Sequence, residues 1–387
     1  MATMTPDERF ALITENLQEV LNQDLIKTIL DEGKNPRVYW GTAPTGRPHS
    51  GYLVPALKIA QLLAAGCDIT ILIADLHAHL DALKSDYELV AHRARYYQFT
   101  ITAMLQAAGV STDKLRFVLG SSYQTTPKYS LDVYRLSTMV SEHDARKSAA
   151  EIVKQSANSP LSGLLYPILQ VLDEEYLDVD VQFGGMDQRK LFAASTEWHP
   201  KLGYRKRAHL LNPLVPGLSG GKMSSSEEDS KIDLLEPEES IRKKIRKAHA
   251  APRETENNGL LAFVKYVLIP ASALKEGNPG FRVSRDRDGL EPLVYTNIEQ
   301  MLEDYKNDIL SPQILKPAVA DAVVELMAPI RAAYEKSPEW QEAALKAYPP
   351  PPPKQKKEKK QKDKKPKDKE AGNPPIANGE TANGAAQ

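Results

Sequence analysis

Between residues 37 and 212 the sequence alternates short apolar runs with longer amphipathic stretches. The apolar runs have the length of strands, and the stretch from Gly51 to Gly66 places its apolar residues on one face at helical spacing. Strands that alternate with helices in this way are typical of a parallel sheet with helices on its faces. The pattern therefore predicts a doubly wound α/β domain, with candidate strands at 37–40, 68–74, 115–120, 179–184 and 208–212.

The pattern changes twice towards the C-terminus. Beyond Asp233 charged segments with helix-period apolar residues replace the strands, which predicts a mainly helical domain. From residue 349 a run of prolines excludes helix and central strand, and the lysine-rich residues that follow cannot form an apolar core. We therefore expect an α/β domain at 1–232, a helical domain at 233–348 and a disordered basic tail at 349–387.

Composition excludes several classes of protein. Cys67 is the only cysteine, so an intramolecular disulfide and a cysteine-based metal site are impossible, and we expect a reducing compartment. No run approaches 18 uninterrupted apolar residues, and the acidic N-terminal stretch lacks the apolar core of a secretory signal. We therefore expect no membrane span and no targeting leader. The net charge of −1 conceals a lysine-rich run at 354–370 on an otherwise acidic chain.

Two polar segments indicate a phosphate-binding site. The first, GTAPTGRPHSGY, follows the strand at 37–40 and places His49 at the N-terminus of the next helix, where unpaired N–H groups and the helix dipole favour an anion. The second, GLSGGKMSSSEEDSKID at 217–233, is a glycine-rich polar loop that carries Lys222 and three serines. Either segment alone is more often a surface loop, but their joint presence favours phosphate chemistry.

These segments resemble the signatures of a known family. PTGRPHSGY is similar to the HIGH signature of class I aminoacyl-tRNA synthetases, and KMSSS, from Lys222 to Ser226, resembles its KMSKS partner. ADLHAHLD, LLYPILQVLDEEYL and VQFGGMDQRKLF resemble the archaeal and eukaryotic cytosolic tyrosyl-tRNA synthetases. The likeness is strong from 37 to 231 and looser to 349. It implies a Rossmann-type catalytic domain, an α-helical anticodon-binding domain and tyrosine–tRNA ligase activity in the cytoplasm.

The reaction of this family needs alignment and charge stabilisation, not a general base. The tyrosine carboxylate, already ionised, attacks the α-phosphate of ATP, pyrophosphate leaves, and the tyrosyl group then moves to the terminal ribose of tRNA-Tyr. The resemblance makes His49, Lys222 and Ser225 catalytic, with Ser225 in the place of a second lysine in many class I enzymes. Mg²⁺ is expected to arrive with ATP and to need no protein metal site. The implied ATP-binding residues are Gly41, Pro44, His49, Gly51, Lys222, Met223, Ser224, Ser225 and Ser226.

The stretch LLYPILQVLDEE favours a helix with a polar stripe. Tyr166, Gln170 and Asp173 are spaced by four and three residues and share one helix face. An amphipathic helix facing water is the ordinary alternative, but the strongly apolar remainder indicates that the stripe faces a cavity. By resemblance, Asp173 and Tyr39 hold the substrate phenol, and Tyr166, Gln170 and Gln188 address its α-amino group. The implied tyrosine-binding set is Tyr39, Ala74, His77, Gln124, Tyr166, Gln170, Asp173 and Gln188.

ADLHAHLD, at 74–81, directly follows a predicted strand and alternates acids with histidines. That alternation is also compatible with a metal cluster. The resemblance instead assigns Ala74 and His77 to the wall of the amino-acid pocket, and we expect no resident metal.

Several basic segments are candidates for contact with tRNA. Arg189 and Lys190 follow Gln188 at a strand-to-helix turn, and by resemblance Arg189 reads the first base pair of the acceptor stem; a pair of surface charges is the alternative. SPQILK resembles HPxDLK of relatives, but Ile314 replaces the aspartate, which leaves the anticodon contact unassigned. The tail lysines are expected to attract tRNA phosphates without sequence preference.

The segment RKKIRK, from Arg242 to Lys247, resembles a nuclear-import signal and would support a minor nuclear pool. It is also compatible with an ordinary exposed helix, because Glu238 and Glu239 stand four residues ahead of Arg242 and Lys243.

Three other functions fit parts of the sequence. A tryptophanyl synthetase shares both signatures, but Tyr39 with Asp173 suits a phenol better than an indole. A small-molecule nucleotidyltransferase has a similar first loop, but its usual two-histidine signature is missing. A catalytically inactive RNA-binding protein would not need an intact amino-acid pocket. By resemblance we also expect a homodimer, with one tRNA-Tyr spanning both subunits.

Overall fold

The computed structural model describes most of the chain and divides it into two units, of which residues 1–349 form the first. The KMSSS segment, Lys222 to Ser226, lies outside the described residues, and so does the tail beyond residue 350. The described ranges are 4–81, 87–153, 160–221, 230–276, 280–286 and 289–350.

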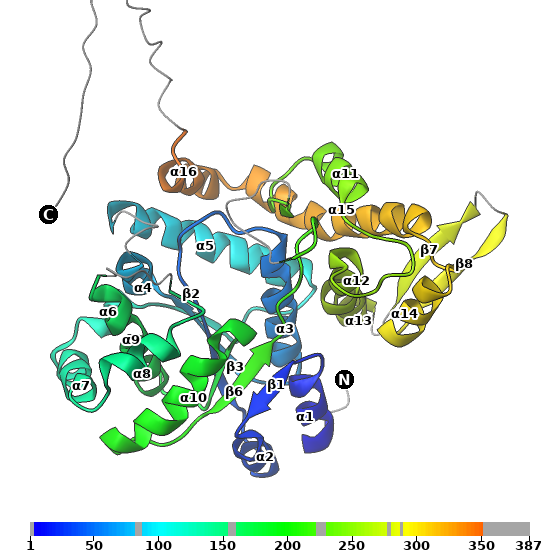
Figure 1. Cartoon of the computed structure of the whole chain (residues 1–387). Helices are drawn as coiled ribbons and strands as arrows, with labels where there is room; N and C mark the ends of the chain where they lie inside the picture. Colours follow the sequence, from blue (N-terminus) through cyan, green and yellow to red (C-terminus); the bar gives the residue numbers. More distant parts are fainter. Residues whose placement is uncertain are drawn as a thin grey trace, which may run out of the picture. The chain divides into compact units, whose positions relative to one another are not determined.

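Within these ranges a six-stranded sheet forms the centre of the first unit, in the order β1-β6-β5-β2-β3-β4 (Figure 1). Strands β2 to β6 are parallel, and β1 pairs antiparallel with β6 at the edge. The inner strands are apolar because both of their faces are covered: every residue of β6 is buried. The bounds are β1 (Glu19–Leu21), β2 (Arg37–Thr42), β3 (Asp68–Ile73), β4 (Leu115–Leu119), β5 (Val181–Gly185) and β6 (Ala208–Asn212).

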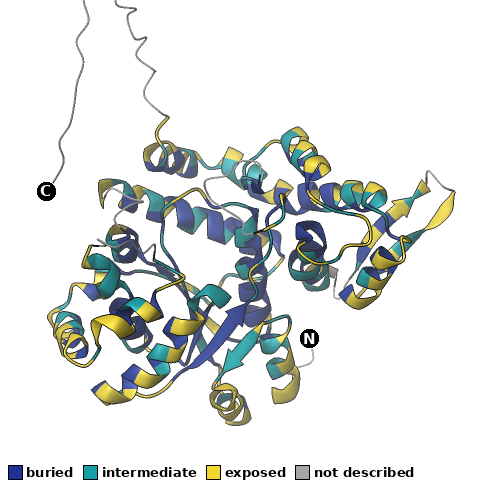
Figure 2. Cartoon of the chain, in the orientation of Figure 1, coloured by how far each residue is buried: buried dark blue, intermediate teal, exposed yellow. Residues whose placement is uncertain are grey.

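The doubly wound fold is confirmed, and the predicted strands agree with β2 to β6 to within two residues at each end. Strand β1 was not predicted, because three residues are too few to show a period. Figure 2 shows the buried interior of the sheet and the exposed outer faces of the helices. The helices and helical turns of this part are α1 (Pro6–Thr14), α2 (Gln23–Asp31), η1 (Ser50–Tyr52), α3 (Leu53–Ala64), α4 (Asp75–Leu80), α5 (Tyr87–Ala107), α6 (Ser121–Gln124), α7 (Pro127–Ser137), α8 (Glu142–Ser148), α9 (Ser162–Tyr176), η2 (Met186–Gln188), α10 (Arg189–Trp198) and η3 (His199–Leu202).

The C-terminal part of the unit is mainly helical, as predicted, but it also contains a hairpin that the sequence reading missed. In the described residues beyond 233, β7 (Phe281–Arg285) and β8 (Leu290–Tyr295) pair antiparallel. No described helix is long and apolar enough to cross a membrane. The helices are α11 (Glu238–Lys247), α12 (Gly259–Phe263), the π-helical turn η5 (Val264–Leu268), α13 (Ile269–Glu276), α14 (Ile298–Lys306), α15 (Pro312–Lys336) and α16 (Pro338–Ala347).

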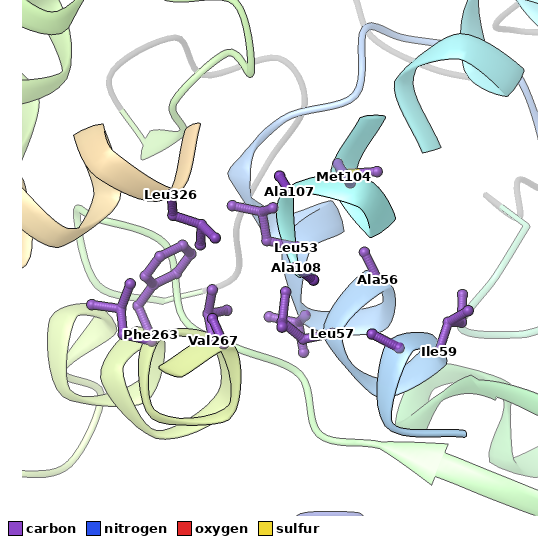
Figure 3. Packing of buried hydrophobic residues seen from close by; sticks show 14 of the residues in the cluster. Leu53, Ala56, Leu57, Ile59, Met104, Ala107, Ala108, Phe263, Val267 and Leu326 are labelled. Carbon is purple, nitrogen blue, oxygen red and sulfur yellow. The ribbon is translucent and has the colours of Figure 1, made fainter. Parts of the chain in front are cut away.

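One hydrophobic core crosses the predicted boundary at residue 232. Figure 3 shows Leu53 and Leu57 of α3 and Ala107 of α5 facing Phe263 of α12 and Leu326 of α15. The α/β and helical parts are therefore packed as one compact unit, and their division into two domains of different function stays a prediction.

Candidate active site

The strand order reverses beside β2. The chain runs from β2 through β3 to β4 on one side, and later adds β5 and β6 on the other side. In open sheets of this kind ligands bind beyond the carboxyl ends of the strands at the point of reversal. The segments that follow β2, β3, β4 and β5 carry most of the predicted site residues.

A buried carboxylate, Asp173 on α9, forms the centre of the predicted tyrosine pocket. Its Oδ1 accepts hydrogen bonds from the Tyr123 hydroxyl at 2.7 Å, from Gln124 Nε2 at 2.7 Å and from the Tyr129 hydroxyl at 3.0 Å. Its Oδ2 has no hydrogen-bond partner among the described residues, and His77 Nε2 lies 3.9 Å away. Burial raises the pKa of Asp173 to about 7, although the three donors act in the opposite direction. The carboxylate is therefore fully buried and retains one free acceptor.

Tyr39 reaches the same pocket from β2. Its ring packs with Leu72 and Ala74, and its hydroxyl lies 3.4 Å from the backbone oxygen of Gln170. Burial, with the nearby charge of Asp173 adding to it, raises the pKa of the Tyr39 phenol well above its usual range. The phenol is therefore neutral.

Two aromatic rings form another side of this pocket. His77 on α4 meets Tyr166 on α9 edge to face, with ring centroids 4.7 Å apart. Burial lowers the pKa of His77 to about 4, so the imidazole is neutral near pH 7.

Gln170 and Gln188 join α9 to the turn that follows β5. Gln170 Nε2 donates to Gln188 Oε1 at 2.7 Å. This approach requires a glycine beneath it, because a Cβ on Gly184 would lie 2.9 Å from Gln188 Oε1 and 2.6 Å from the Phe192 ring. The structure thus brings together the predicted tyrosine-binding residues on α4, α6, α9 and η2.

His49 caps the helical turn after β2. Its backbone is extended, and its Nδ1 accepts a hydrogen bond from the Gly51 N–H at 3.2 Å. Burial lowers the pKa of His49 to about 4, and the positive charge of Lys231 contributes to the shift. In this neutral ring the bond to Nδ1 assigns the proton to Nε2, which leaves an N–H donor.

A short ladder joins the two signature segments. The Ser50 N–H donates to the Ile232 oxygen at 2.7 Å, and the backbones of His49 and Asp233 form an isolated antiparallel β-bridge. The Leu218 N–H donates to the Ser230 oxygen at 3.1 Å, which joins the described residues on either side of 222–229. The stem of the second signature therefore lies against the first. Gly41 lies in β2, Pro44 in the following loop and Gly51 in η1.

The predicted tRNA-binding residues form ion pairs with acids of the same chain. Arg189 donates through Nε and a terminal nitrogen to Glu19, at 2.6 and 2.9 Å. Lys190 pairs with Glu151 at 2.7 Å, and both basic side chains are about half exposed.

The acids and histidines of ADLHAHLD diverge in the structure. Asp75 accepts the Ser121 N–H at 2.8 Å, His79 packs against Tyr87, and His77 faces the amino-acid pocket. Among the described residues no group of three or more such side chains is arranged to hold a metal ion.

Tyr123 and Tyr129 are pocket residues that the sequence reading missed. Both hydroxyls donate to Asp173, and their rings meet edge to face with centroids 5.7 Å apart. The signal available in the sequence was weak: both tyrosines follow the strand at 115–120, but neither shows a period of its own.

Comparison with known proteins agrees with this geometry. Residues 31–328 match the family model of tRNA synthetases class I (W and Y). The chain is 52% identical over 366 residues to the cytoplasmic tyrosine–tRNA ligase of Saccharomyces cerevisiae, with 93% of each chain covered. It is 52% identical to that of Danio rerio over 90% of this chain, but spans only 64% of that protein. The crystal structure of the Archaeoglobus fulgidus tyrosyl-tRNA synthetase complexed with L-tyrosine matches 85% of this chain and 99% of its own, with 33% identity and a TM-score of 0.78. The chain therefore belongs to the class I tRNA synthetases of the tryptophan and tyrosine family.

Proposed function

We propose that this chain is a tyrosine–tRNA ligase. It activates L-tyrosine with ATP to tyrosyl-adenylate and pyrophosphate, and then transfers the tyrosyl group to the terminal ribose of tRNA-Tyr. The names of the yeast and zebrafish relatives support this assignment. The observation that carries it is the carboxylate of Asp173, which is fully buried and keeps Oδ2 available as an acceptor.

Asp173 selects the phenol of the substrate. Oδ2 accepts a hydrogen bond from the phenol hydroxyl of the substrate, and the Tyr39 hydroxyl contacts that same phenol hydroxyl. Phenylalanine would fill the pocket but leave the carboxylate without this partner, which is costly in a buried site. An indole offers its N–H at a different distance and is a poorer match.

The opposite end of the substrate is held by the polar stripe of α9. Gln170 and Gln188, already joined to each other at 2.7 Å, address the α-ammonium group together with Tyr166. This orients the tyrosine carboxylate towards ATP. The remaining wall is formed by Ala74, His77 and Gln124.

The nucleotide binds along the loop that follows β2, and the residues of the second signature contact its phosphates. The Nε2–H of His49 donates to a phosphate, while Lys222 and Ser225 stabilise the charge of the leaving pyrophosphate. Mg²⁺ enters with ATP as part of the substrate. Packing inside the protein does not require a glycine at position 41, because a Cβ there would meet its neighbours at an ordinary 3.6 Å or more. We therefore assign Gly41 to nucleotide binding, where the missing side chain lets ATP approach the backbone closely.

Arg189 and Lys190 contact the acceptor end of tRNA-Tyr. Their ion pairs with Glu19 and Glu151 are exposed and therefore weak, so phosphate or base contacts can replace them. The helical part, 233–348, reads the anticodon. Ile314 lines a surface cavity of about 820 Å³ there, in place of the aspartate of some relatives.

The enzyme acts as a homodimer through an apolar surface on α7 and the start of α9. Leu131 and Tyr134 on α7 are 58% and 68% exposed, and Leu161, beside α9, is 77% exposed. Exposed apolar side chains that are grouped on one surface are typical of an interface, whereas single ones are common on any protein. We assign the partner as a second copy of this chain.

The enzyme works in the cytoplasm, in agreement with the names of its relatives. A minor nuclear pool directed by Arg242 to Lys247 stays a prediction. In the structure Arg242 pairs with Glu238 at 2.8 Å and with Asp321, as expected of an exposed helix. Binding of tRNA by the tail is tested by deleting residues 350–387, which should raise the KM for tRNA at low salt.

The deciding experiment is ATP–pyrophosphate exchange with each of the twenty amino acids, for wild type and Lys222→Ala. We expect exchange with tyrosine alone, and its loss in the variant. Exchange with tryptophan would overturn the pocket assignment, and no exchange with any amino acid would favour an RNA-binding protein without catalysis.

A further inference from the structure

Two tyrosine hydroxyls hold the middle of the loop between β2 and η1. The backbone oxygen of Gly46 accepts a hydrogen bond from Tyr97 of α5 at 2.7 Å and another from Tyr348 at 2.8 Å. A carbonyl oxygen has two lone pairs, so both donors can bind it at once. Tyr348 directly follows α16 and is 302 residues away from Gly46 along the chain. The residue that follows α16, the last helix of the first unit, thus contacts the loop that follows β2.

Tyr348 is itself held in place from several sides. The guanidinium of Arg47 lies over its ring, 5.0 Å from the centroid, and that of Arg93 lies at 5.4 Å. The Tyr96 ring meets it edge to face at 5.3 Å, and Arg93 Nε donates to the Ala347 oxygen at 3.3 Å. Tyr348 therefore contacts the loop twice, through its ring at Arg47 and through its hydroxyl at Gly46.

The same contacts continue to His49. The Tyr97 hydroxyl lies 3.3 Å from the Tyr52 hydroxyl, and the Tyr52 ring meets His49 edge to face at 5.6 Å. Gly46 and His49 are therefore fixed against one group of aromatic side chains. A loop held in this way loses less conformational entropy when a ligand binds, and it keeps its donors aligned.

We propose that Tyr348 is a positioning residue that fixes residues 43–49 for ATP, so that the end of the C-terminal helical part completes the nucleotide site. This inference rests on the proposed role of that loop in binding ATP. Tyr348 touches neither substrate; it acts through Gly46 and Arg47. Its loss should impair the use of ATP and leave the tyrosine pocket on α9 unaffected.

The test compares Tyr348→Phe and Tyr348→Ala in the full chain, by tyrosine-dependent ATP–pyrophosphate exchange. The phenylalanine variant removes only the hydroxyl, and we expect kcat/KM for ATP to fall about two- to tenfold, the range of a single hydrogen bond. The alanine variant also removes the ring beneath Arg47 and should fall further. In both variants the KM for tyrosine should equal that of wild type.

Tyr334→Phe is the matched control. It removes the phenol hydroxyl of Tyr334 on α15, a residue whose ring packs edge to face on Trp340. It should match wild type for both substrates. Unchanged ATP kinetics in Tyr348→Ala would overturn the proposal, and so would an equal rise in the KM values for ATP and tyrosine, which would indicate a general structural role.

A second variant separates this inference from the proposed function. His49→Asn keeps a side-chain acceptor for the Gly51 N–H but removes the Nε2 donor. If His49→Asn loses exchange while Tyr348→Ala retains wild-type ATP kinetics, the loop binds ATP and only the role of Tyr348 is wrong. If His49→Asn also exchanges normally, the proposed role of the loop fails as well.

Discussion

At the scale of single residues, the most informative group is the carboxylate of Asp173. Burying an ionised carboxylate is costly unless hydrogen bonds compensate for the lost water. Tyr123, Gln124 and Tyr129 donate to Oδ1, which stabilises the ion, and Oδ2 stays available. In the proposed function this second oxygen is the source of selectivity, because a substrate with a hydroxyl would satisfy it and one without a hydroxyl would not.

Replacing Asp173 by asparagine tests this role with little change of shape. A hydrogen bond to a charged acceptor is worth more than one to a neutral amide, so kcat/KM for tyrosine should fall about 10- to 100-fold. Exchange with phenylalanine should fall less, which lowers the discrimination between the two amino acids. Asp173→Ala should lose selective tyrosine activation altogether. Unchanged tyrosine-dependent exchange in either variant would remove Asp173 from the site.

The raised pKa of Asp173, about 7, predicts a pH dependence of tyrosine binding. The ionised form accepts the phenol hydrogen, so binding weakens as the pH falls through this pKa. The KM for tyrosine should rise about fivefold between pH 7 and pH 6.

His77, Tyr123, Tyr129 and Glu174 do not change charge in this pH range. Burial lowers the pKa of His77 to about 4 and raises those of Tyr123 and Tyr129 well above 10, and the histidines around Glu174 lower the pKa of that carboxyl. Asp173→Asn should therefore show a flat KM profile, whereas a flat profile in wild type would contradict the assignment.

At the scale of elements, the site depends on how α9 and α12 pack against their neighbours. Glu174, next to Asp173 on α9, accepts hydrogen bonds from Ser195 Oγ and His209 Nε2, both at 2.8 Å. These bonds tie the pocket helix to α10 and β6. At the start of α12, Gly259 lies against the backbone at Gly217, which leads into the second signature loop.

Substitution of Gly259 by alanine tests the support of that loop. A Cβ there would lie 2.5 Å from the Gly217 backbone oxygen, so backbone must move. We expect a loss of about 1–3 kcal/mol in the free energy of unfolding and slower pyrophosphate exchange. Gly280→Ala is the control, because a Cβ at Gly280 meets nothing within 4 Å. Equal urea midpoints and equal exchange rates for the two variants would contradict the prediction, because they would show that the backbone at Gly217 can move at no cost in stability.

At the scale of the whole molecule, the two functional parts share one core. Helices α3 and α5 of the α/β part pack against η5 and α15 through residues such as Leu57, Val267 and Leu326 (Figure 3). The loop after β2 and the C-terminal helices are therefore parts of one compact unit, and Tyr348, which directly follows α16, contacts that loop.

The apolar surface on α7 and α9 predicts the oligomeric state. A glutamate at a buried interface is left without a partner, so Tyr134→Glu combined with Leu161→Glu should convert a dimer to a monomer. Sedimentation equilibrium of the full chain measures the mass directly. Val294→Glu is the control, because Val294 is 57% exposed on β8, away from these helices. If the double variant kept the wild-type mass as a dimer, the interface would lie elsewhere.

What the sequence determined by itself is the information carried by local patterns. Short apolar runs between amphipathic stretches identified β2 to β6, and spacing by four and three residues placed Tyr166, Gln170 and Asp173 on one helix face. The two signatures were recognised from short segments. Elements without a clear local period were missed, namely β1 and the hairpin of β7 and β8.

Only the tertiary structure decided which residues, far apart in the sequence, donate hydrogen bonds to the same acceptor oxygen. That Tyr123 and Tyr129 both donate to Asp173, and that Tyr348 and Tyr97 share the Gly46 oxygen, depends on packing between elements far apart in the chain. The physical reason is that a hydrogen bond requires a fixed distance and direction, which strand and helix periods do not encode. The pKa values of the site have the same origin, because burial is a property of the packed molecule.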